Sequence, residues 1–243
     1  MERWLLGGLG ILLLLIGCAN PAPNMAEKDQ EVADVAELKR LVLLPITLSI
    51  SPKDPTQCQG PCNPERDRSE IALAASTFVH SARDYEIVCL DYACPRIPDS
   101  VISDAELTTW AASISRWIEE NPGKTQLPAD LVSILHQIEE AYDVEGILLI
   151  NGKLRYVQYA DIAHWILTLT FSSYYNLFRG HTADLQAHVF AAANGSKLWA
   201  GEAVVTQIGQ EQVTPTTPAI SRYGPRLFEE LPKSRAEDAC NNC

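Results

Sequence analysis

The sequence predicts a single α/β domain with a mixed β-sheet covered by helices, in which a parallel β-α-β start is followed by an antiparallel meander. A strand–helix–strand pattern over residues 38–90 predicts two parallel strands, because such crossovers join parallel neighbours in one sheet. Two amphipathic helices are expected between residues 103 and 142. From Gly146 onward, apolar residues alternate with a period of two, and Asn194-Gly195 is typical of a hairpin turn.

The first part of the predicted domain contains two strands around one helix. The run LVLLPITLSI within Leu38–Ile50 is apolar and β-branched, which suits a buried strand, and Pro45 indicates a bulge or an edge position. Asp67 with Glu70 forms a capping-box pattern that predicts the start of the helix through IALAASTFVHSAR. The second strand is expected at Tyr85–Leu90.

Two more helices are expected after these strands. Ser103 with Glu106 is a second capping box, and the helix after it should end at Asn121-Pro122-Gly123. Pro128 is expected to open a third helix. Trp110 and Trp117 lie on the apolar stripe of the second helix, and this spacing favours core packing over a binding surface.

The rest of the domain is expected to form antiparallel strands. Residues 146–159 predict one long strand or two short ones, and residues 162–171 and 185–193 predict two more. Asn194-Gly195 then predicts a two-residue turn into the return strand KLWAGEAVVTQI.

Residues 1–17 have the features of a secretory signal peptide. Arg3 precedes an apolar run that is too short to span a bilayer as a helix, and the small residue Gly17 comes just before Cys18. The ending Leu-Ile-Gly-Cys resembles the lipobox of bacterial lipoproteins. This resemblance implies lipidation of Cys18 by a diacylglycerol and by an acyl chain such as palmitate, and several acyl chains anchor a protein stably. The alternative is an uncleaved anchor or a buried apolar helix.

The remaining chain divides into a tether, a domain and a tail. Residues 18–37 are polar with two early prolines and predict a flexible tether, which places the α/β domain at 38–207. Residues 208–243 contain recurring prolines and no apolar period, so they predict a largely disordered tail. By resemblance to enterobacterial sorting, Ala19 after the cysteine implies a lipid-anchored protein of the outer membrane that faces the periplasm.

The charge balance excludes one class of partner. The chain contains 31 Asp and Glu against 19 Lys and Arg, which gives a formal net charge of -12. Such a surface repels nucleic acids and anionic lipid headgroups. We therefore expect no nucleic-acid binding, and we expect the lipid on Cys18 to hold the protein at the membrane.

Six further cysteines are disulfide candidates, and they occur in three close pairs: Cys58 and Cys62, Cys89 and Cys94, and Cys240 and Cys243. An even number in an exported chain indicates disulfides, but it leaves the connectivity open. Because parallel strands end at one edge of a sheet, the first two pairs are expected to cluster there. A zinc site of four thiolates is the less favoured alternative, because the spacings are wider than in zinc knuckles.

Other chemistry is only weakly indicated. The last pair has the C-x-x-C spacing of thiol oxidoreductases, but no helix follows it to lower a thiol pKa, so a local disulfide or a clasp onto the domain is favoured. His181, Asp184 and His188 raise the question of a metal site, yet histidines seven apart on an extended strand point to opposite faces. No G-x-S-x-G, Walker A, H-E-x-x-H or G-x-G-x-x-G motif is present. We expect no catalytic residue, no metal and no cofactor.

Two stretches resemble a broad group of envelope lipoproteins. The group includes the curli-secretion channel family, related lipoproteins with a fold like the TolB amino-terminal domain, and activators of peptidoglycan synthases. The first stretch is AYDVEGILL (141–149), where Glu145 stands in place of the usual aspartate, and the second is DLQAHVFAAANGSKLWAGEA (184–203). The resemblance implies the same order of elements over roughly residues 38–207.

Together these features predict a non-enzymatic assembly, accessory or scaffolding protein that contacts envelope proteins through exposed loops and the proline-rich tail. One alternative is a pore-forming secretion subunit of the curli-channel type, a homo-oligomer in which residues 162–193 enter the membrane as barrel strands. A second alternative is a thiol- or metal-dependent periplasmic enzyme that uses the cysteine cluster. The expected helical cover of the sheet and the lack of an acid, base and nucleophile set favour the first interpretation.

Overall fold

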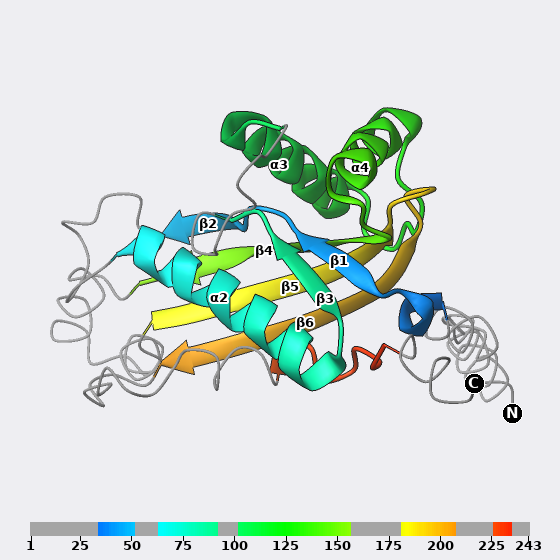
Figure 1. The fold of residues 1–243 in the computed structure, drawn as a ribbon. Helices are drawn as coiled ribbons and strands as arrows, with labels where there is room; N and C mark the ends of the chain where they lie inside the picture. Colours follow the sequence, from blue (N-terminus) through cyan, green and yellow to red (C-terminus); the bar gives the residue numbers. More distant parts are fainter. Residues whose placement is uncertain (1–33, 52–62, 92–101, 157–180, 208–225, 235–243) are drawn as a thin grey trace, which may run out of the picture.

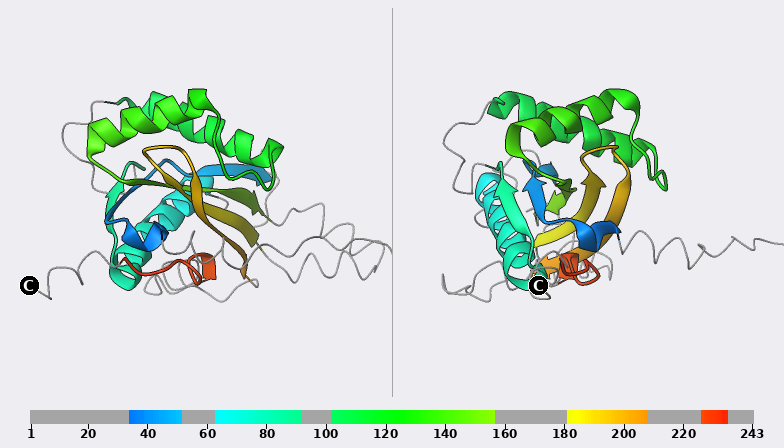
Figure 2. Two further views of the ribbon diagram at one scale, coloured as in Figure 1. Left: turned by 90° about the vertical axis from the view of Figure 1, so that its right-hand side faces the viewer. Right: turned by 45° about the vertical axis from the view of Figure 1, so that its right-hand side comes forward.

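The computed structural model is built around a six-stranded mixed β-sheet, and it describes residues 34–51, 63–91, 102–156, 181–207 and 226–234 (Figure 1). The strands are β1 (Arg40–Leu43), β2 (Thr47–Ser51), β3 (Glu86–Cys89), β4 (Gly146–Arg155), β5 (His181–Ala191) and β6 (Lys197–Gln207). The helices are α2 (Pro64–Arg83), α3 (Asp104–Glu120) and α4 (Ala129–Tyr142). Helix α2 covers one face of the sheet and α3 with α4 covers the other (Figure 2). This architecture confirms the predicted fold class.

The strand order is β3-β1-β4-β5-β6, with β2 also paired to β4. β1 is parallel to both of its neighbours, and Leu43 stands opposite Cys89 where β1 and β3 end. β4, β5 and β6 are antiparallel. The β-α-β pattern therefore predicts the parallel half of the sheet correctly.

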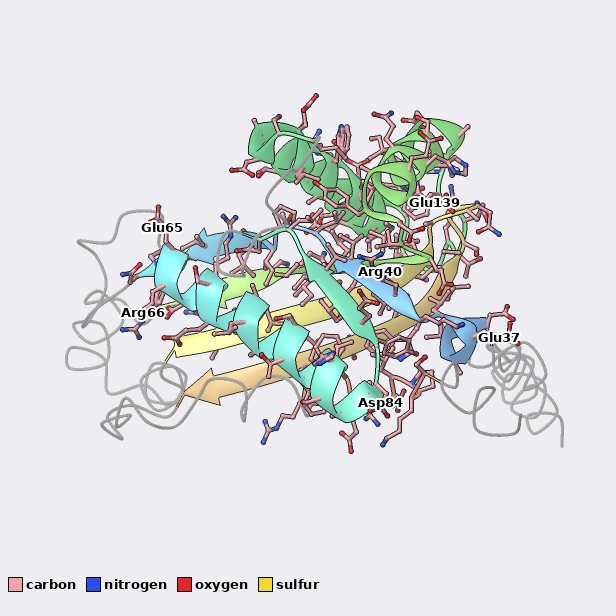
Figure 3. All side chains as sticks on the ribbon, viewed as in Figure 1. Glu37, Arg40, Glu65, Arg66, Asp84 and Glu139 are labelled. Carbon is pink, nitrogen blue, oxygen red and sulfur yellow. The ribbon has the colours of Figure 1, made fainter. Side chains whose placement is uncertain are left out.

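Arg40, labelled in Figure 3, forms ion pairs with Glu86 of β3 (3.2 Å) and with Asp143 after α4 (3.3 Å).

Pro45 divides the first predicted strand into β1 and β2. Residues 44–46 stand opposite only two residues of β4, because the register shifts by one across the proline. This is the bulge expected at a residue that has no N–H to donate. The neighbouring Ile46 N–H is donated to the buried carboxylate of Asp91 (3.3 Å). The bulge is confirmed, whereas a single continuous strand over this run is wrong.

Helix α2 begins upstream of the predicted capping box. Its N-cap is Asn63, whose side-chain oxygen accepts the Arg66 N–H (3.1 Å), and Pro64 lies in the first turn. Asp67 lies inside the helix, where it accepts a hydrogen bond from the Tyr156 hydroxyl (2.6 Å). The predicted start at Asp67 is therefore wrong, because an asparagine cap followed by proline is the stronger local signal.

Helices α3 and α4 begin where the sequence predicts. The Ser103 side chain accepts the Glu106 N–H (3.3 Å) and the Glu106 carboxylate accepts the Ser103 N–H (3.1 Å), which confirms the capping box. Pro128 is the N-cap of α4. Trp110 and Trp117 pack, partly buried, against the core beneath these helices. None of the helices in the described ranges combines the length and the apolar composition of a membrane span.

Strand β4 is buried on both faces over its first six residues. Ile147 and Leu149 belong to the core under α3 and α4, while Leu148 and Ile150 belong to the core on the α2 side. A strand covered on both faces is expected to be continuously apolar. The alternation expected from Gly146 therefore appears only at the end of the strand.

The β5–β6 hairpin has a five-residue connection, residues 192–196, instead of the predicted two-residue turn. The Gly195 N–H is donated to the Ala191 carbonyl (2.9 Å), and the Ala191 N–H is donated to the Ser196 carbonyl (2.9 Å). Gly195 has a φ of 70°, a left-handed conformation that favours glycine. The Asn-Gly pair correctly predicts a hairpin, but the length predicted for the turn is wrong. The chain that leaves β5 still bonds to the segment before β4 at Ala192, so the turn cannot be confined to two residues.

Two segments outside the predicted domain boundaries belong to the folded core. Val35 is fully buried within a helical turn at 34–37, although residues 18–37 are expected to form a tether. Three residues of the predicted tail are also buried: Leu227, Phe228 and Leu231. The expected domain of 38–207 is therefore too short at both ends. The predicted strand at 162–171 lies outside the described residues.

The C-terminal segment (residues 226–234) packs beside β6 and returns to the start of the domain (Figure 1). The Arg83 guanidinium donates to the Phe228 carbonyl (2.9 Å). The Tyr85 hydroxyl, whose pKa is raised by burial, lies 3.1 Å from each of the carbonyl oxygens of residues 35 and 232. The Ser234 hydroxyl donates to the Leu38 carbonyl (2.7 Å), so the last described residues lie beside the first.

Candidate functional site

The sheet face that α3 and α4 cover changes from apolar to polar along the strands. Its apolar part contains three fully buried side chains, Ile147, Leu149 and Phe190. Farther along the same face, Asn151 and Lys153 of β4 stand opposite Gln186 and Asp184 of β5, and His188 precedes them. The polar stripe therefore begins where the apolar helix faces end.

A cleft of about 470 Å³ lies over this polar stripe. Its floor is formed by β4 and β5, with Lys197 added from the start of β6. Its wall is formed by the last turn of α3 and the turn that follows, including Trp117, Asn121 and Lys124. A volume of this size lies in the range of sites that enclose small organic ligands.

Two buried polar side chains line the cleft with unsatisfied hydrogen-bonding atoms. His188 is 6% exposed and Asn151 is 3% exposed. Among the described residues, neither ring nitrogen of His188 has a hydrogen-bond partner, and neither does the side-chain oxygen of Asn151. Buried polar groups without a partner carry a free-energy penalty of about 1–3 kcal/mol each. These atoms are covered by their neighbours, so a ligand that uncovered them and supplied the missing partners would gain affinity from both residues.

His188 is neutral at physiological pH. Burial, together with the nearby positive charge of Lys197, lowers the pKa of its imidazole to about 4. A neutral imidazole offers one N–H donor and one nitrogen acceptor. His188 is therefore suited to a hydrogen-bonding partner of both kinds, and it is a poor site for an isolated charge.

Positive charge is concentrated around the cleft. Three of the seven lysines of the chain line it, and they come from three different elements: Lys124, Lys153 and Lys197. Within the described ranges none of the three forms an ion pair, although the cleft also contains Glu119 and Asp184. On a chain with a net charge of -12, this is a local excess of cations.

A second cleft, of about 440 Å³, adjoins the first and shares Gln186 and His188 with it. It lies between β6 and the C-terminal segment and contains one arginine, Arg226. Three glutamates also line it: Glu202, Glu229 and Glu230. The two adjoining clefts therefore have opposite charge, positive near α3 and negative near the C-terminal segment.

The cleft near α3 has lysine, carboxylate and histidine side chains as its reactive groups. Its described lining contains no serine, threonine, tyrosine or cysteine. In the part of the chain that the structure describes, no three His, Cys, Asp or Glu side chains converge as metal ligands. His188 and Asp184 line the cleft, whereas the side chain of His181 lies outside the description.

The sequence places its site candidates mostly outside the described residues. Cys89 ends β3, is 8% exposed and is disulfide-bonded. The lipidation candidate Cys18 and the other five disulfide candidates, Cys58, Cys62, Cys94, Cys240 and Cys243, lie outside the described ranges. Which cysteine pairs with Cys89, and how the others pair, stay predictions.

The cleft itself was not singled out by its sequence pattern. Asp184, Gln186 and His188 alternate with apolar residues along β5, which is the pattern of a strand with one polar face. Burial of His188 depends on elements distant in sequence, and the three lysines are far apart in the chain. The alternation is thus a usable signal for a polar face, but it does not locate a cleft.

No protein-family model matches the chain, and no curated protein matches it significantly. The solved structures that resemble it include the following three. Lipoprotein GNA1162 from Neisseria meningitidis is 14% identical over 72% of this chain and 86% of its own, with a TM-score of 0.34. The hypothetical protein CT253 from Chlamydia trachomatis is 12% identical over 79% and 92%, with a TM-score of 0.43. The LpoB C-terminal domain from Salmonella enterica is 10% identical over 74% and 96%, with a TM-score of 0.32.

At this level of similarity, the three structures do not determine what this chain does. The more specific resemblance to the curli-channel and TolB-like group stays a prediction.

Proposed function

We propose that this protein is a non-enzymatic accessory protein of the bacterial envelope that binds another envelope protein through the cleft near α3. The observation that carries the proposal is the pair of buried, unsatisfied side chains in that cleft, His188 and Asn151. A folded domain leaves few buried polar groups unpaired, so two in one cleft indicate a surface completed by a partner.

Binding is favoured over catalysis by the state of His188. A general base works best when its pKa is close to the working pH. Burial lowers the pKa of His188 to about 4, so this imidazole is a weak base at neutral pH. The described lining also offers no hydroxyl or thiol for His188 to activate. The cleft is therefore suited to recognition.

Membrane attachment is the second part of the proposal. A signal peptide at residues 1–17 and lipidation of Cys18 would leave residues 18–33 as a tether, because the described fold begins at residue 34. A flexible tether of this length reaches about 20 Å r.m.s.. The domain would then stay close to the periplasmic face of the outer membrane, where envelope proteins are accessible to its cleft.

Replacing Cys18 by serine is expected to abolish lipidation, because no other residue of the lipobox-like segment carries a thiol. Metabolic labelling with an alkyne palmitate analogue should mark the wild-type protein and not the C18S variant, and only the wild type should sediment with outer membranes. Cys240→Ser is the matched control and should be labelled normally. Equal labelling of the C18S variant would contradict the anchor.

A photo-crosslinking residue placed at Lys153 is expected to form an adduct of one defined mass in living cells, because Lys153 lines the proposed binding cleft. The control position is Glu65, an exposed residue of α2 on the other side of the sheet (Figure 3). Mass spectrometry of the adduct identifies the partner. Adducts of equal yield at both positions, or none at Lys153, would reject the cleft as the contact surface.

A further inference from the structure

We propose that the cleft near α3 binds an extended, acidic polypeptide segment of the partner protein. The inference rests on the proposed function, since it specifies the chemistry of the partner at the same cleft. It is carried by the unsatisfied side chains of His188 and Asn151 together with the three lysines around them.

The unsatisfied atoms match a polypeptide backbone. Neutral His188 offers one donor and one acceptor, and the Asn151 side-chain oxygen needs a donor. Every non-proline residue of an extended peptide carries one N–H and one C=O, so a single segment that displaces the side chains over these atoms can supply both kinds of partner. A simple anion offers only acceptors and would leave the oxygen of Asn151 unsatisfied.

The lysines specify the charge of the segment. Lys124, Lys153 and Lys197 approach the cleft from the turn after α3, from β4 and from β6. Within the described ranges their ammonium groups have no carboxylate within 4 Å, even though Glu119 and Asp184 lie in the same cleft. Aspartate or glutamate side chains of the partner can therefore occupy positions between them.

The adjoining cleft restricts where the segment lies. Its three glutamates, Glu202, Glu229 and Glu230, outnumber the single Arg226 and repel carboxylates. The acidic part of the partner is therefore confined to the side near α3. The volume of about 470 Å³ accommodates a segment of a few residues, and a small ion would leave most of it empty.

The test uses a fluorescently labelled peptide of alternating glutamate and alanine, with a lysine–alanine peptide of the same length as its counterpart. The folded wild-type protein should bind the acidic peptide and not the basic one. Reversing two cleft charges, Lys153→Glu with Lys197→Glu, should weaken binding about tenfold or more, because two attractions become repulsions.

The matched control is Lys39→Glu with Lys233→Glu, which changes the net charge equally at two exposed lysines outside the cleft. It should retain most of the affinity. In the wild type, the acidic peptide should also shift the NMR signal of the His188 ring. Equal binding of both peptides, equal loss in both double variants, or an unmoved His188 signal would overturn the inference.

The result is separable from that of the cross-linking experiment. A defined adduct at Lys153 with no binding of the acidic peptide would reject the acidic segment and leave the accessory function standing. Binding of the acidic peptide without any adduct in cells would support the chemistry of the cleft and reject the proposed function.

Discussion

Replacing Phe228 by alanine is expected to lower the free energy of unfolding by about 3–5 kcal/mol, the usual cost of removing a fully buried phenylalanine. The Phe228 side chain is 0% exposed. Its ring stacks on Trp199 of β6, with centroids 5.9 Å apart, and on Phe78 of α2, with centroids 6.2 Å apart. Alanine would leave a cavity between the helix and the strand. Urea denaturation followed by circular dichroism measures the loss.

Glu229→Ala is the control for this variant. Glu229 is exposed, and its interaction with Arg83 uses the main-chain carbonyl, which alanine keeps. A surface change of this kind typically alters stability by less than about 0.5 kcal/mol. If Phe228→Ala unfolds at the same urea concentration as Glu229→Ala, the C-terminal segment does not belong to the cooperative core.

The wild-type protein is expected to lose about 3 kcal/mol of stability through His188 as the pH falls from 6.5 to 4. The pKa of this imidazole is about 4 in the folded protein and about 6.5 in an unfolded chain, mainly because burial disfavours the charged form. The unfolded chain therefore binds a proton over this interval while the folded protein does not. The destabilisation caused by His188 vanishes above about pH 6.5 and reaches its full size below about pH 4.

Thermal or urea unfolding across this pH range, compared between the wild type and His188→Gln, isolates the effect. The other ionisable groups are the same in both proteins, so their contributions cancel in the difference. His136→Gln serves as the control, because it removes an exposed histidine of α4 that lies outside the cleft. Parallel curves for the wild type and His188→Gln would contradict the assignment.

The sequence predicts those parts of the fold that depend on local chemistry. The Ser103–Glu106 capping box, the start of α4 after Pro128 and the hairpin at Asn194-Gly195 each depend on a few neighbouring residues. The parallel start follows from the strand–helix–strand order alone. The errors occur where segments distant in sequence determine which residues are buried. β4 loses its alternation because helices cover both of its faces. Val35 belongs to one buried cluster with residues near the other end of the chain.

The C-terminal segment and the cleft show why composition and spacing are insufficient. Prolines around residues 226–234 indicate disorder, but the three apolar residues among them have a specific place beside Trp199 and Phe78. Likewise, His188 has no motif around it, and its environment arises only when α3 and three strands come together. The cysteines attract attention in the sequence because they are spaced in pairs, whereas a binding surface assembled from separate elements has no such signature.

The ribosome makes Val35 near the beginning of the chain and Phe228 near its end, yet both belong to one buried cluster. A chain that stops after β6 contains every helix and strand described above, but the indole of Trp199 lacks the ring that stacks on it. Folding therefore reaches completion only when nearly the whole polypeptide has been synthesised. Premature termination between Gln207 and Leu227 yields an open core that proteases and chaperones would treat as unfinished, instead of a normal domain without its tail.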